Sequence, residues 1–301
     1  MTTLSDINQT FAIADHITFI EGADGLVFAN LKNPQATAQI CLQGGHITAY
    51  QPTHHAPVIW VSEKAVYQKN KAIRGGVPLC WPWFGNHPSD PQKPAHGIAR
   101  TNPWSVILTE QPNANESLIQ LQLDITDAIK TLWPHAFELI LSVRVGKTLS
   151  IELIAKNTGT ETLSLGAALH TYFNISNVNK THITGLDNTQ YLDKFDGSLE
   201  KTQNGPLVIT EPTDRVYLNT STACTLVDEG LKRQIQVKKS GSQTTVVWNP
   251  WAENAAKMGD FGDDEYPNMV CVEAANAMDD VVKVAPGGSH ILSQVIQVLA
   301  L

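Results

Sequence analysis

Short runs in which hydrophobic and polar residues alternate dominate this chain. Residues 119–125 read Ile-Gln-Leu-Gln-Leu-Asp-Ile, and the same period of two continues over residues 137–145 and 149–155. This period puts successive side chains on opposite faces of a strand, so each run predicts a half-buried strand. Further strands are expected within residues 16–30, 39–42, 46–50, 163–174, 269–276 and 290–301.

Helical signals are few. Residues 126–133 predict one short helix, with Thr126 as its N-cap and Pro134 beyond its end, and residues 254–258 predict a single helical turn. No repeat of 20–50 residues is visible, and no Pro/Ser-rich linker or change of composition divides the chain. We therefore expect one all-β domain over residues 1–301, a sandwich of many short strands.

Composition narrows the function more than the fold. The chain has 301 residues, 42% of them hydrophobic, which is enough for a large core. Its net charge is -8 with both signs interspersed, and it has no Lys/Arg run. This pattern argues against nucleic acid or an anionic membrane surface as the main partner.

The cysteines and the N-terminal segment bear on compartment. Four cysteines lie far apart without a CxxC pair, so we expect reduced, buried thiols rather than a zinc site or a disulfide framework. The first twenty residues lack a basic segment followed by an apolar one. No apolar run approaches the roughly 20 residues of a membrane span. We expect a cytoplasmic protein, with a monomer favoured over an oligomer.

One long segment fits neither a strand nor a helix. Residues 74–100, RGGVPLCWPWFGNHPSDPQKPAHGIAR, are rich in Pro, Gly and Trp. The segment begins with Arg74 and ends with Arg100. Long structured loops in compact domains are usually functional. Arginines are planar, permanently charged donors suited to phosphate or carboxylate, although either one alternatively braces the loop through backbone carbonyls. We predict that this loop lines a site for a small, polar, anionic ligand.

The aromatic and histidine side chains of this loop are open to two interpretations. Trp81, Trp83 and Phe84 either stack on a sugar face or pack in the core, and packing is favoured. His96 lies between Ala95 and Gly97. Small neighbours allow close approach of the backbone to a ligand, which makes His96 a candidate binding residue.

Glu273 is the most informative single residue. It interrupts the apolar run MVCVEAAN, and an unpaired buried carboxylate costs several kcal/mol, so it requires a partner or a purpose. An apolar environment raises a carboxylate pKa toward the range of a general base. His170, on the predicted strand 163–174, would complete an acid–base pair near neutral pH. The structural alternative for Glu273 is a pair with an arginine across the sheet, or a side chain that faces solvent, and a lone strand histidine such as His170 is more often structural. Asp214 is a weaker candidate for binding hydroxyl groups.

Several stretches together resemble the hexose-6-phosphate mutarotases, or glucose-6-phosphate 1-epimerases, of the aldose 1-epimerase (galactose mutarotase-like) superfamily. They are RGGVPLCWPWFG, HGIAR, ALHTYFNI, the segment Asp214–Tyr217, WNPWAENAAKMGDFGDDEYPNMVCVEAAN and APGGSH, in the family's order from about residue 74 onward. The resemblance implies a β-supersandwich of mostly antiparallel strands with few helices, no metal and no cofactor. It also implies interconversion of the α and β anomers of glucose 6-phosphate and related hexose 6-phosphates.

The resemblance assigns roles residue by residue. Glu273 matches the general base that takes the anomeric proton, and His170 the general acid that protonates the ring oxygen. Arg74, His96, Arg100 and Asp214 match substrate-binding positions. Ala95 stands where some relatives have glutamine, so any contact made by that side chain is lost here.

Two other readings stay open from sequence. A non-catalytic sugar-phosphate-binding or sensing protein on this fold would have lost the Glu/His pair, and both residues are present here. A glycoside-processing enzyme would need a second carboxylate about 5–10 Å from Glu273, for which Asp214 is the candidate.

Overall fold

The structure, a computed structural model, describes residues 3–301 and is built almost entirely of antiparallel strands. Within these residues there are three short α-helices: α1 (Leu4–Phe11), α2 (Asp127–Leu132) and α3 (Trp251–Ala255). Single 3-10 turns occur at η1 (Ala23–Gly25), η2 (Ala99–Thr101), η3 (Val178–Lys180), η4 (Lys194–Asp196), η5 (Tyr266–Asn268) and η6 (Met278–Asp280). The all-β class predicted from the alternating runs is confirmed.

The largest sheet has nine strands. Its order is β16 (Leu207–Val208), β13 (Thr181–Thr184), β18 (Cys224–Asp228), β19 (Arg233–Ser240), β23 (Ser289–Ala300), β9 (Thr148–Asn157), β8 (Phe137–Val145), β7 (Glu116–Leu123) and β6 (Trp104–Asn113). The long final strand β23 lies at its centre, between β19 and β9.

A second sheet carries the functional candidates. Its order is β15 (Leu199–Thr202), β14 (Gln190–Asp193), β17 (Thr213–Tyr217), β20 (Thr244–Asn249), β21 (Met269–Asn276), β11 (Ala167–Leu169) and β5 (Leu79–Cys80). An eighth strand, β12 (Tyr172–Asn174), also pairs with β21, beyond the end of β11.

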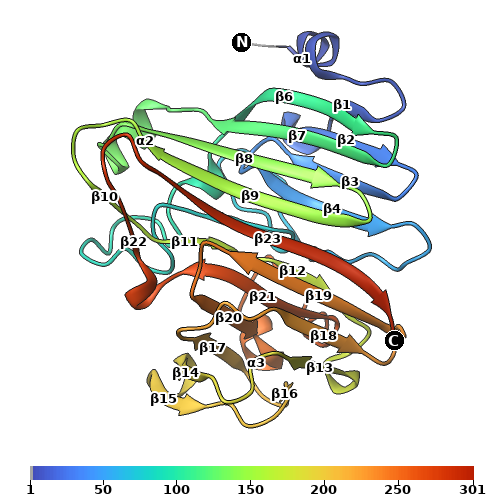
Figure 1. The fold of residues 1–301 in the computed structure, drawn as a ribbon, viewed down its shortest axis with the longest axis vertical. Coiled ribbons are helices and arrows are strands. Elements are labelled where there is room, and N and C mark those ends of the chain that lie inside the picture. The colour runs from blue at the N-terminus through green and yellow to red at the C-terminus, as the bar shows by residue number, and fades with distance from the viewer. Residues whose placement is uncertain (1–2) are drawn as a thin grey trace.

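Two smaller sheets complete the fold. One consists of β1 (Ile17–Glu21), β2 (Val27–Asn33), β3 (Ala36–Cys41) and β4 (His46–Pro52), and the other of β10 (Leu163–Leu165) and β22 (Val282–Val284). Figure 1 shows the nine-stranded sheet crossing the molecule, with β1–β4 behind its upper half and the eight-stranded sheet behind its lower half. Contacts of β2 with β7, and of β21 with β23, join these layers.

The alternating pattern explains why the sheets pack face to face. In β8 and β9 the apolar positions Leu139, Leu141, Leu153 and Ile151 are buried. They join one continuous core that also takes in apolar residues of β1–β4 and of β21. Burial of apolar area is the main favourable term in folding, so the period of two in the sequence sets which face of each strand points inward.

The sequence-based helix predictions hold only where a cap is present. Helix α2 begins after Thr126, whose hydroxyl accepts a hydrogen bond from Ile129 N, as predicted. The predicted turn at 254–258 starts earlier, as α3. Helix α1 was not predicted. Its N-terminus is capped by a capping box between Thr3 and Asp6, although none of its residues is fully buried.

The strand expected over residues 163–174 is wrong as a single element. The chain is divided into β10, β11 and β12, and β10 pairs with β22 in a different sheet from the other two. At Gly166 the backbone N–H donates to the Pro82 carbonyl, and Trp83 Cα lies 3.3 Å from where a Cβ would be. The long loop 74–100 therefore packs against this segment and interrupts the strand.

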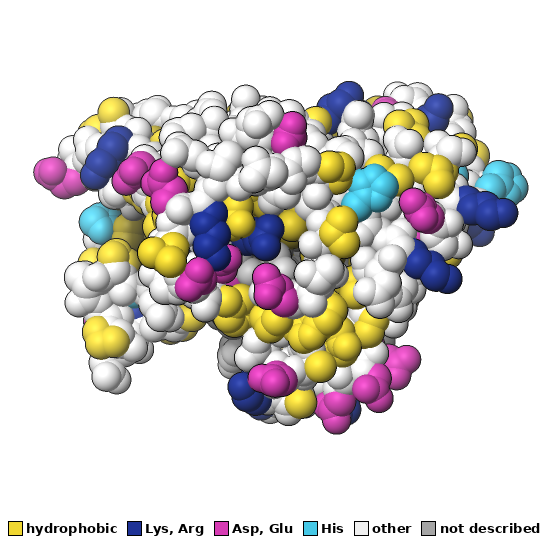
Figure 2. Space-filling view, turned by 90° about the horizontal axis from the view of Figure 1, so that it is seen from below, with side chains coloured by type: hydrophobic (Ala, Val, Ile, Leu, Met, Phe, Trp, Pro, Cys, Tyr) yellow, Lys and Arg dark blue, Asp and Glu magenta, His cyan; other side chains and the backbone are white. Residues whose placement is uncertain are grey.

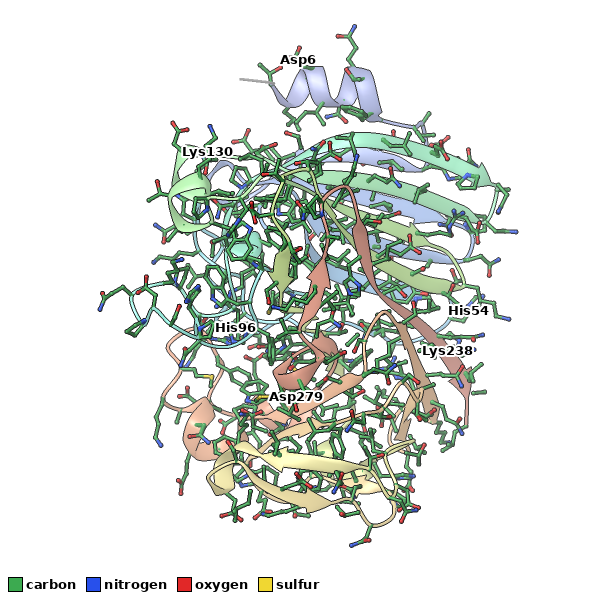
Figure 3. The ribbon with its side chains drawn as sticks, turned by 60° about the vertical axis from the view of Figure 1, so that its left-hand side comes forward. Asp6, His54, His96, Lys130, Lys238 and Asp279 are labelled. Carbon is green, nitrogen blue, oxygen red and sulfur yellow. The ribbon has the colours of Figure 1, made fainter. Side chains whose placement is uncertain are left out.

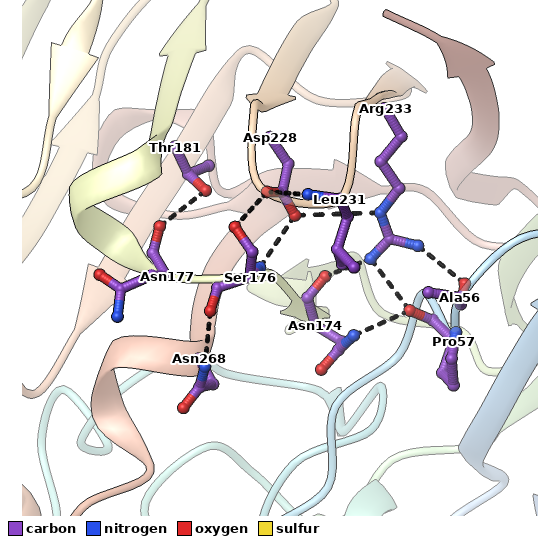
Figure 4. A network of polar contacts seen from close by, with 10 residues as sticks. All are labelled: Ala56, Pro57, Asn174, Ser176, Asn177, Thr181, Asp228, Leu231, Arg233 and Asn268. Atoms are coloured by element: carbon purple, nitrogen blue, oxygen red, sulfur yellow. Dashed lines mark hydrogen bonds and ion pairs between the residues drawn. The ribbon is translucent and has the colours of Figure 1, made fainter.

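A buried arginine ties the sheets to a loop (Figure 4). Arg233 donates hydrogen bonds to the backbone carbonyls of Ala56, Pro57 and Asn174. Its Nε lies 4.0 Å from Asp228 Oδ2, and Asp228 also accepts from Ser176 and Leu231. The guanidinium thus donates to three backbone carbonyls, and the Pro57 carbonyl also accepts from the Asn174 side-chain amide.

The state of the cysteines and the distribution of surface charge follow the composition. All four cysteines are free and buried, as predicted. On the face shown in Figure 2, acidic and basic side chains are interspersed, and hydrophobic side chains gather in a strip below them. Over the described range 3–301, no helix has the length and apolar character needed to cross a membrane.

Candidate active site

A cavity of about 600 Å³ opens on the face of the eight-stranded sheet that points away from the nine-stranded sheet. It is lined by Arg74, Phe84, Gly85, Asn86, Ala95, His96, His170, Tyr172, Lys194, Asp214, Val216, Val246, Trp248, Met258, Glu273 and Met278. The loop 74–100 forms one wall and carries His96, which Figure 3 labels. Strands β17, β20 and β21 form the floor.

Strand register places the polar groups of the floor. Val216 pairs with Val246, and Val246 pairs with Glu273, so these three side chains form one row across β17, β20 and β21. Asp214 and Trp248 form the next row. Directly paired residues point to the same face of a sheet. The pairing therefore brings Asp214 and Glu273, which are far apart in sequence, into one cavity.

His170 reaches Glu273 because the ladder is broken beside it. Strand β11 ends at Leu169, opposite Ala274, and β12 resumes at Tyr172, opposite Cys271. Residues 170 and 171 therefore lie beside Val272 and Glu273 without regular pairing. The His170 N–H donates to the Pro78 carbonyl on the other side of the segment.

His170 and Glu273 form a buried pair at the floor of the cavity. Nδ1 of His170 lies 3.3 Å from Oε1 of Glu273, and their side chains are 13% and 1% exposed. Neither His170 Nδ1 nor Glu273 Oε2 has a well-aligned hydrogen-bond partner among residues 3–301. The distance is close, but the angles are not those of a formed hydrogen bond. Each of the two side chains can therefore give up this contact and form a hydrogen bond with a ligand instead.

Burial shifts both members of the pair toward their neutral forms. Desolvation raises the pKa of Glu273 well above its ordinary value, and the Asp214 carboxylate adds to this effect. Desolvation lowers the pKa of His170 well below its ordinary value, with smaller contributions from His96, Arg100 and Arg74. A carboxylate with a raised pKa is a stronger base once it is ionised, and perturbed groups of this kind are typical of active sites.

Two aromatic side chains and an arginine surround His170. The Tyr172 ring stacks on the His170 ring, with 4.9 Å between centroids and 9° between planes, and Trp248 meets it edge-on. Arg74 donates to the Tyr172 hydroxyl at 3.3 Å and to Asp260 Oδ1 at 3.2 Å. Arg74 is therefore held at the cavity wall with its charge partly compensated by a carboxylate.

The loop 74–100 presents His96 through a strained turn. His96 has φ 64° and Gly97 has φ 76°, and a Cβ on Gly97 would lie 2.0 Å from the Trp81 carbonyl oxygen. The N–H of Gly85 donates to His96 Nδ1 at 3.3 Å. Desolvation, then Arg100 and Arg74, lower the pKa of His96 to about 3. The neutral ring thus carries its hydrogen on Nε2, which is left as a donor.

Arg100 is the one predicted site residue that does not line the cavity. Its Nη2 donates to the Ala95 carbonyl at 3.0 Å, which is the loop-bracing contact weighed as the alternative from sequence. Trp81 and Trp83 are buried in the core, as favoured. Phe84 corrects that interpretation, because it lines the cavity and meets the His96 ring with 5.2 Å between centroids.

Lys194 is a cavity residue that sequence reasoning missed. It begins η4, at the tip of the β14–β15 hairpin. On the same hairpin Lys201 pairs with Asp193 at 2.9 Å and Asp196 at 2.7 Å. No ion pair among residues 3–301 includes Lys194, whose Nζ lies 3.5 Å from Ser198 Oγ. Lys194 therefore brings to the cavity a positive charge that is held in no ion pair.

Asp214 lies near Lys194 on the floor. Burial raises the pKa of Asp214 to about 6, opposed by the charge of Lys194 and supported by that of Asp193. Above that pH the carboxylate is ionised and accepts hydrogen bonds only, which suits hydroxyl groups of a sugar.

One group of side chains has the ligand types of a zinc site. His170, Cys271 and Glu273 offer a nitrogen, a sulfur and an oxygen within 4.8 Å of one another. A cysteine binds zinc as its thiolate, yet burial raises the pKa of the Cys271 thiol well above its ordinary value. Cys271 is also absent from the cavity lining. The arrangement fits proton transfer between His170 and Glu273 better than metal binding.

The family of the chain follows from comparison with known proteins. The family model for aldose 1-epimerase matches residues 28–297. A candidate glucose-6-phosphate 1-epimerase of Escherichia coli is 37% identical over 258 residues, covering 85% of each chain. A protein of the same name from Salmonella typhimurium is 35% identical over 278 residues, covering 90% of this chain and 92% of its own.

Solved structures agree with this assignment. A candidate mutarotase from Salmonella typhimurium superposes with a TM-score of 0.90 at 31% identity, covering 97% of this chain and 96% of its own. A galactose 1-epimerase from Lactobacillus acidophilus shares the fold, with a TM-score of 0.74 at 12% identity over 94% of this chain and 98% of its own. The chain belongs to the aldose 1-epimerase family.

Proposed function

We propose that this protein interconverts the α and β anomers of D-glucose 6-phosphate and related hexose 6-phosphates. The observation that carries the proposal is the buried His170–Glu273 pair, whose side chains lie 3.3 Å apart at the floor of the cavity. Two positively charged side chains also line this cavity. Relatives named as candidate glucose-6-phosphate 1-epimerases support the choice of substrate. Mutarotation needs one acid and one base at the C1–O5 unit, which matches this pair.

The reaction requires the pair to hold one proton in total. Burial favours this proton on Glu273, and its transfer to His170, 3.3 Å away, gives the charged pair that reacts. Glu273, as carboxylate, takes the hydrogen of the anomeric hydroxyl O1 while His170, as imidazolium, gives a proton to the ring oxygen O5. The C1–O5 bond breaks and C1–O1 becomes a carbonyl. Rotation about C1–C2 presents the other face of the aldehyde. The reverse transfers then close the ring as the other anomer and return both groups to their starting states.

The binding groups are assigned by where they lie. Arg74 and Lys194 are the cations that line the cavity, and we assign the phosphate to them. We assign the sugar hydroxyls to Asp214 and to the Nε2–H of His96, because both residues line the cavity. Arg100 contributes indirectly, by holding the loop through the Ala95 carbonyl. A non-catalytic binding protein would not need the acid–base pair, which supports the enzymatic assignment.

The proposal is tested by NMR saturation exchange between the anomers of glucose 6-phosphate at equilibrium, compared with glucose and galactose. We expect catalysed exchange that is fastest, at subsaturating substrate, for the hexose 6-phosphate. Glu273→Gln is isosteric and removes the base, so it should reduce the catalysed rate by about 10²–10⁴-fold. Saturable binding of glucose 6-phosphate without faster exchange would instead identify a binding protein.

A further inference from the structure

The inward face of β23 is interrupted by one polar side chain. The buried positions of this strand, which lies at the centre of the nine-stranded sheet, are Leu292, Gln294, Ile296 and Val298. Gln294 is fully buried. An amide within an apolar layer costs free energy unless it is hydrogen-bonded. Its partners therefore indicate what this side chain contributes.

Both hydrogen bonds of Gln294 reach the eight-stranded sheet beside the acid–base pair. Its Nε2 donates to the Val272 carbonyl at 3.0 Å, and its Oε1 accepts from the Thr171 hydroxyl at 2.5 Å. Val272 directly precedes Glu273, and Thr171 directly follows His170. The N–H of Val272 also donates to the Thr171 carbonyl at 3.3 Å. One side chain from the opposite sheet thus holds the backbone next to both groups.

The break between β11 and β12 makes this contact important. Regular ladder pairing stops at Leu169 and resumes at Tyr172. Within residues 3–301, a single backbone hydrogen bond, from the Val272 N–H to the Thr171 carbonyl, joins the intervening segment to β21. Contacts with the Pro78 carbonyl on one side and with Gln294 on the other add to it.

We propose that Gln294 is a positioning residue that sets the separation of His170 and Glu273. The inference rests on the proposed function, because it concerns the geometry of that acid–base pair. Gln294 does not line the cavity, and it acts through Thr171 and Val272. Displacement of a catalytic group by about 1 Å costs up to about 10²-fold in rate, so a tie on both strands affects turnover.

The alternative is that Gln294 only stabilises the fold by satisfying two buried polar groups. The two interpretations differ in what a substitution changes. Loss of fold stability lowers the amount of folded enzyme but not the turnover of the molecules that remain folded. Loss of positioning lowers kcat of fully folded enzyme while the binding groups, and hence KM, stay in place.

The test compares Gln294→Leu with a matched control, Asn157→Leu. Asn157 is also a fully buried amide, and its Nδ2 donates to the Glu161 and Val284 carbonyls, away from the cavity. Both variants should lower the midpoint of urea unfolding. Under folded conditions we expect Gln294→Leu to lower kcat for glucose 6-phosphate by about 10-fold to 100-fold, with KM within about 2-fold. Asn157→Leu should leave kcat unchanged.

A second variant and a second readout keep the outcome decisive. Thr171→Val removes the hydroxyl with little change of shape, and should lower kcat in the same direction. The double variant should lose less kcat than the two single variants predict together, because both substitutions remove the same contact. The ring resonances of His170, followed by ¹⁵N NMR, should shift in Gln294→Leu but not in Asn157→Leu.

Equal kcat and unshifted His170 resonances in Gln294→Leu would overturn the positioning role. Wild-type protein without catalysed anomer exchange would instead overturn the proposed function. In that case the His170 resonances still decide whether Gln294 positions the pair.

Discussion

The ring of Tyr172 lies parallel to the ring of His170, with 4.9 Å between centroids and 9° between planes. Tyr172 is fixed in turn by β12, which pairs with β21, and by the hydrogen bond from Arg74 to its hydroxyl. The plane of the His170 imidazole is therefore set by a neighbour that is itself held at two points. A fixed ring plane limits the directions in which the imidazole can deliver a proton.

Removing the Tyr172 ring should lower turnover more than removing its hydroxyl. Tyr172→Leu leaves His170 free to tilt, and we expect kcat for glucose 6-phosphate to fall by about 10-fold. Tyr172→Phe keeps the stacked ring and loses only the contact with Arg74, so kcat should stay within about 2-fold. Anomer exchange measured by NMR on both variants checks this. Equal losses in the two would assign the effect to Arg74 instead of the ring.

Lys194 should discriminate phosphorylated from unphosphorylated sugars. Lys194→Met removes the positive charge that the β14–β15 hairpin brings to the cavity but keeps the length of the side chain. We expect KM for glucose 6-phosphate to rise by about 10-fold, and exchange of glucose to be unaffected, because only the phosphate carries the charge that Lys194 meets. Lys201→Met is the control from the same hairpin, since Lys201 pairs with Asp193 and Asp196 outside the cavity lining.

Arg74→Ala should also penalise glucose 6-phosphate more than glucose, but with a second effect. Arg74 bonds both Asp260 and the Tyr172 hydroxyl, so its loss loosens the wall beside His170. A moderate fall in kcat on glucose should therefore accompany the larger rise in KM on the phosphate ester. Identical losses on both sugars would show that the phosphate is not the group that Arg74 binds.

Buried neutral histidines should make the fold sensitive to acid. Desolvation lowers the pKa of His46 to about 4 and that of His96 to about 3, against an ordinary value near 6.5 in the unfolded chain. The unfolded state then binds more protons than the folded state between these values. Stability is present in full above pH 6.5 and is lost as pH falls, by up to about 1.4 kcal/mol per pH unit for each histidine.

Urea unfolding at pH 7, 6 and 5 measures this slope. His46 makes its ring contact with the Gly75 carbonyl, and His46→Gln keeps a donor there but does not titrate. The variant should lose less stability between pH 7 and pH 5 than the parent chain does. Parallel curves for the two proteins would contradict the assignment to His46.

The Arg233 network should dominate local stability far from the cavity. Arg233→Met removes the hydrogen bonds from Arg233 to three backbone carbonyls and leaves Asp228 without the arginine beside it. Breaking a buried charged network of this kind costs about 3–5 kcal/mol, which equilibrium unfolding in urea would register. Turnover of the molecules that remain folded should not change, because none of these groups lines the cavity.

Local patterns predicted what local physics determines. The alternation over 137–155 predicted β8 and β9, and Thr126 predicted the start of α2, because each signal depends on neighbouring residues alone. The break at His170 was not predictable in the same way. The alternation continues through residues 163–174, and regular pairing is lost at His170, whose N–H donates to the Pro78 carbonyl of the loop 74–100, a contact far away in sequence.

The site was predicted unevenly for the same reason. Glu273 stood out because a carboxylate in an apolar run is costly, and the structure places it fully buried. Lys194 gave no such signal, since a lysine in a turn is ordinarily solvated, and only the pairing of β14 with β17 brings it to the cavity. Gln294 did carry a signal. In the alternating pattern of this strand it falls on the same face as the apolar positions 292, 296 and 298, so its amide must point inward.

The cavity is lined by two parts of one sheet that differ in how many neighbouring strands hold them in place. Glu273 lies on β21, which has neighbours on both sides and a second sheet behind it, while Lys194 lies on the outermost hairpin, joined to the sheet through β14 alone. Changes in the hairpin can accumulate without disturbing the centre. We therefore expect changes in the length or charge of this hairpin to alter which sugars the cavity accepts while the His170–Glu273 pair stays in place.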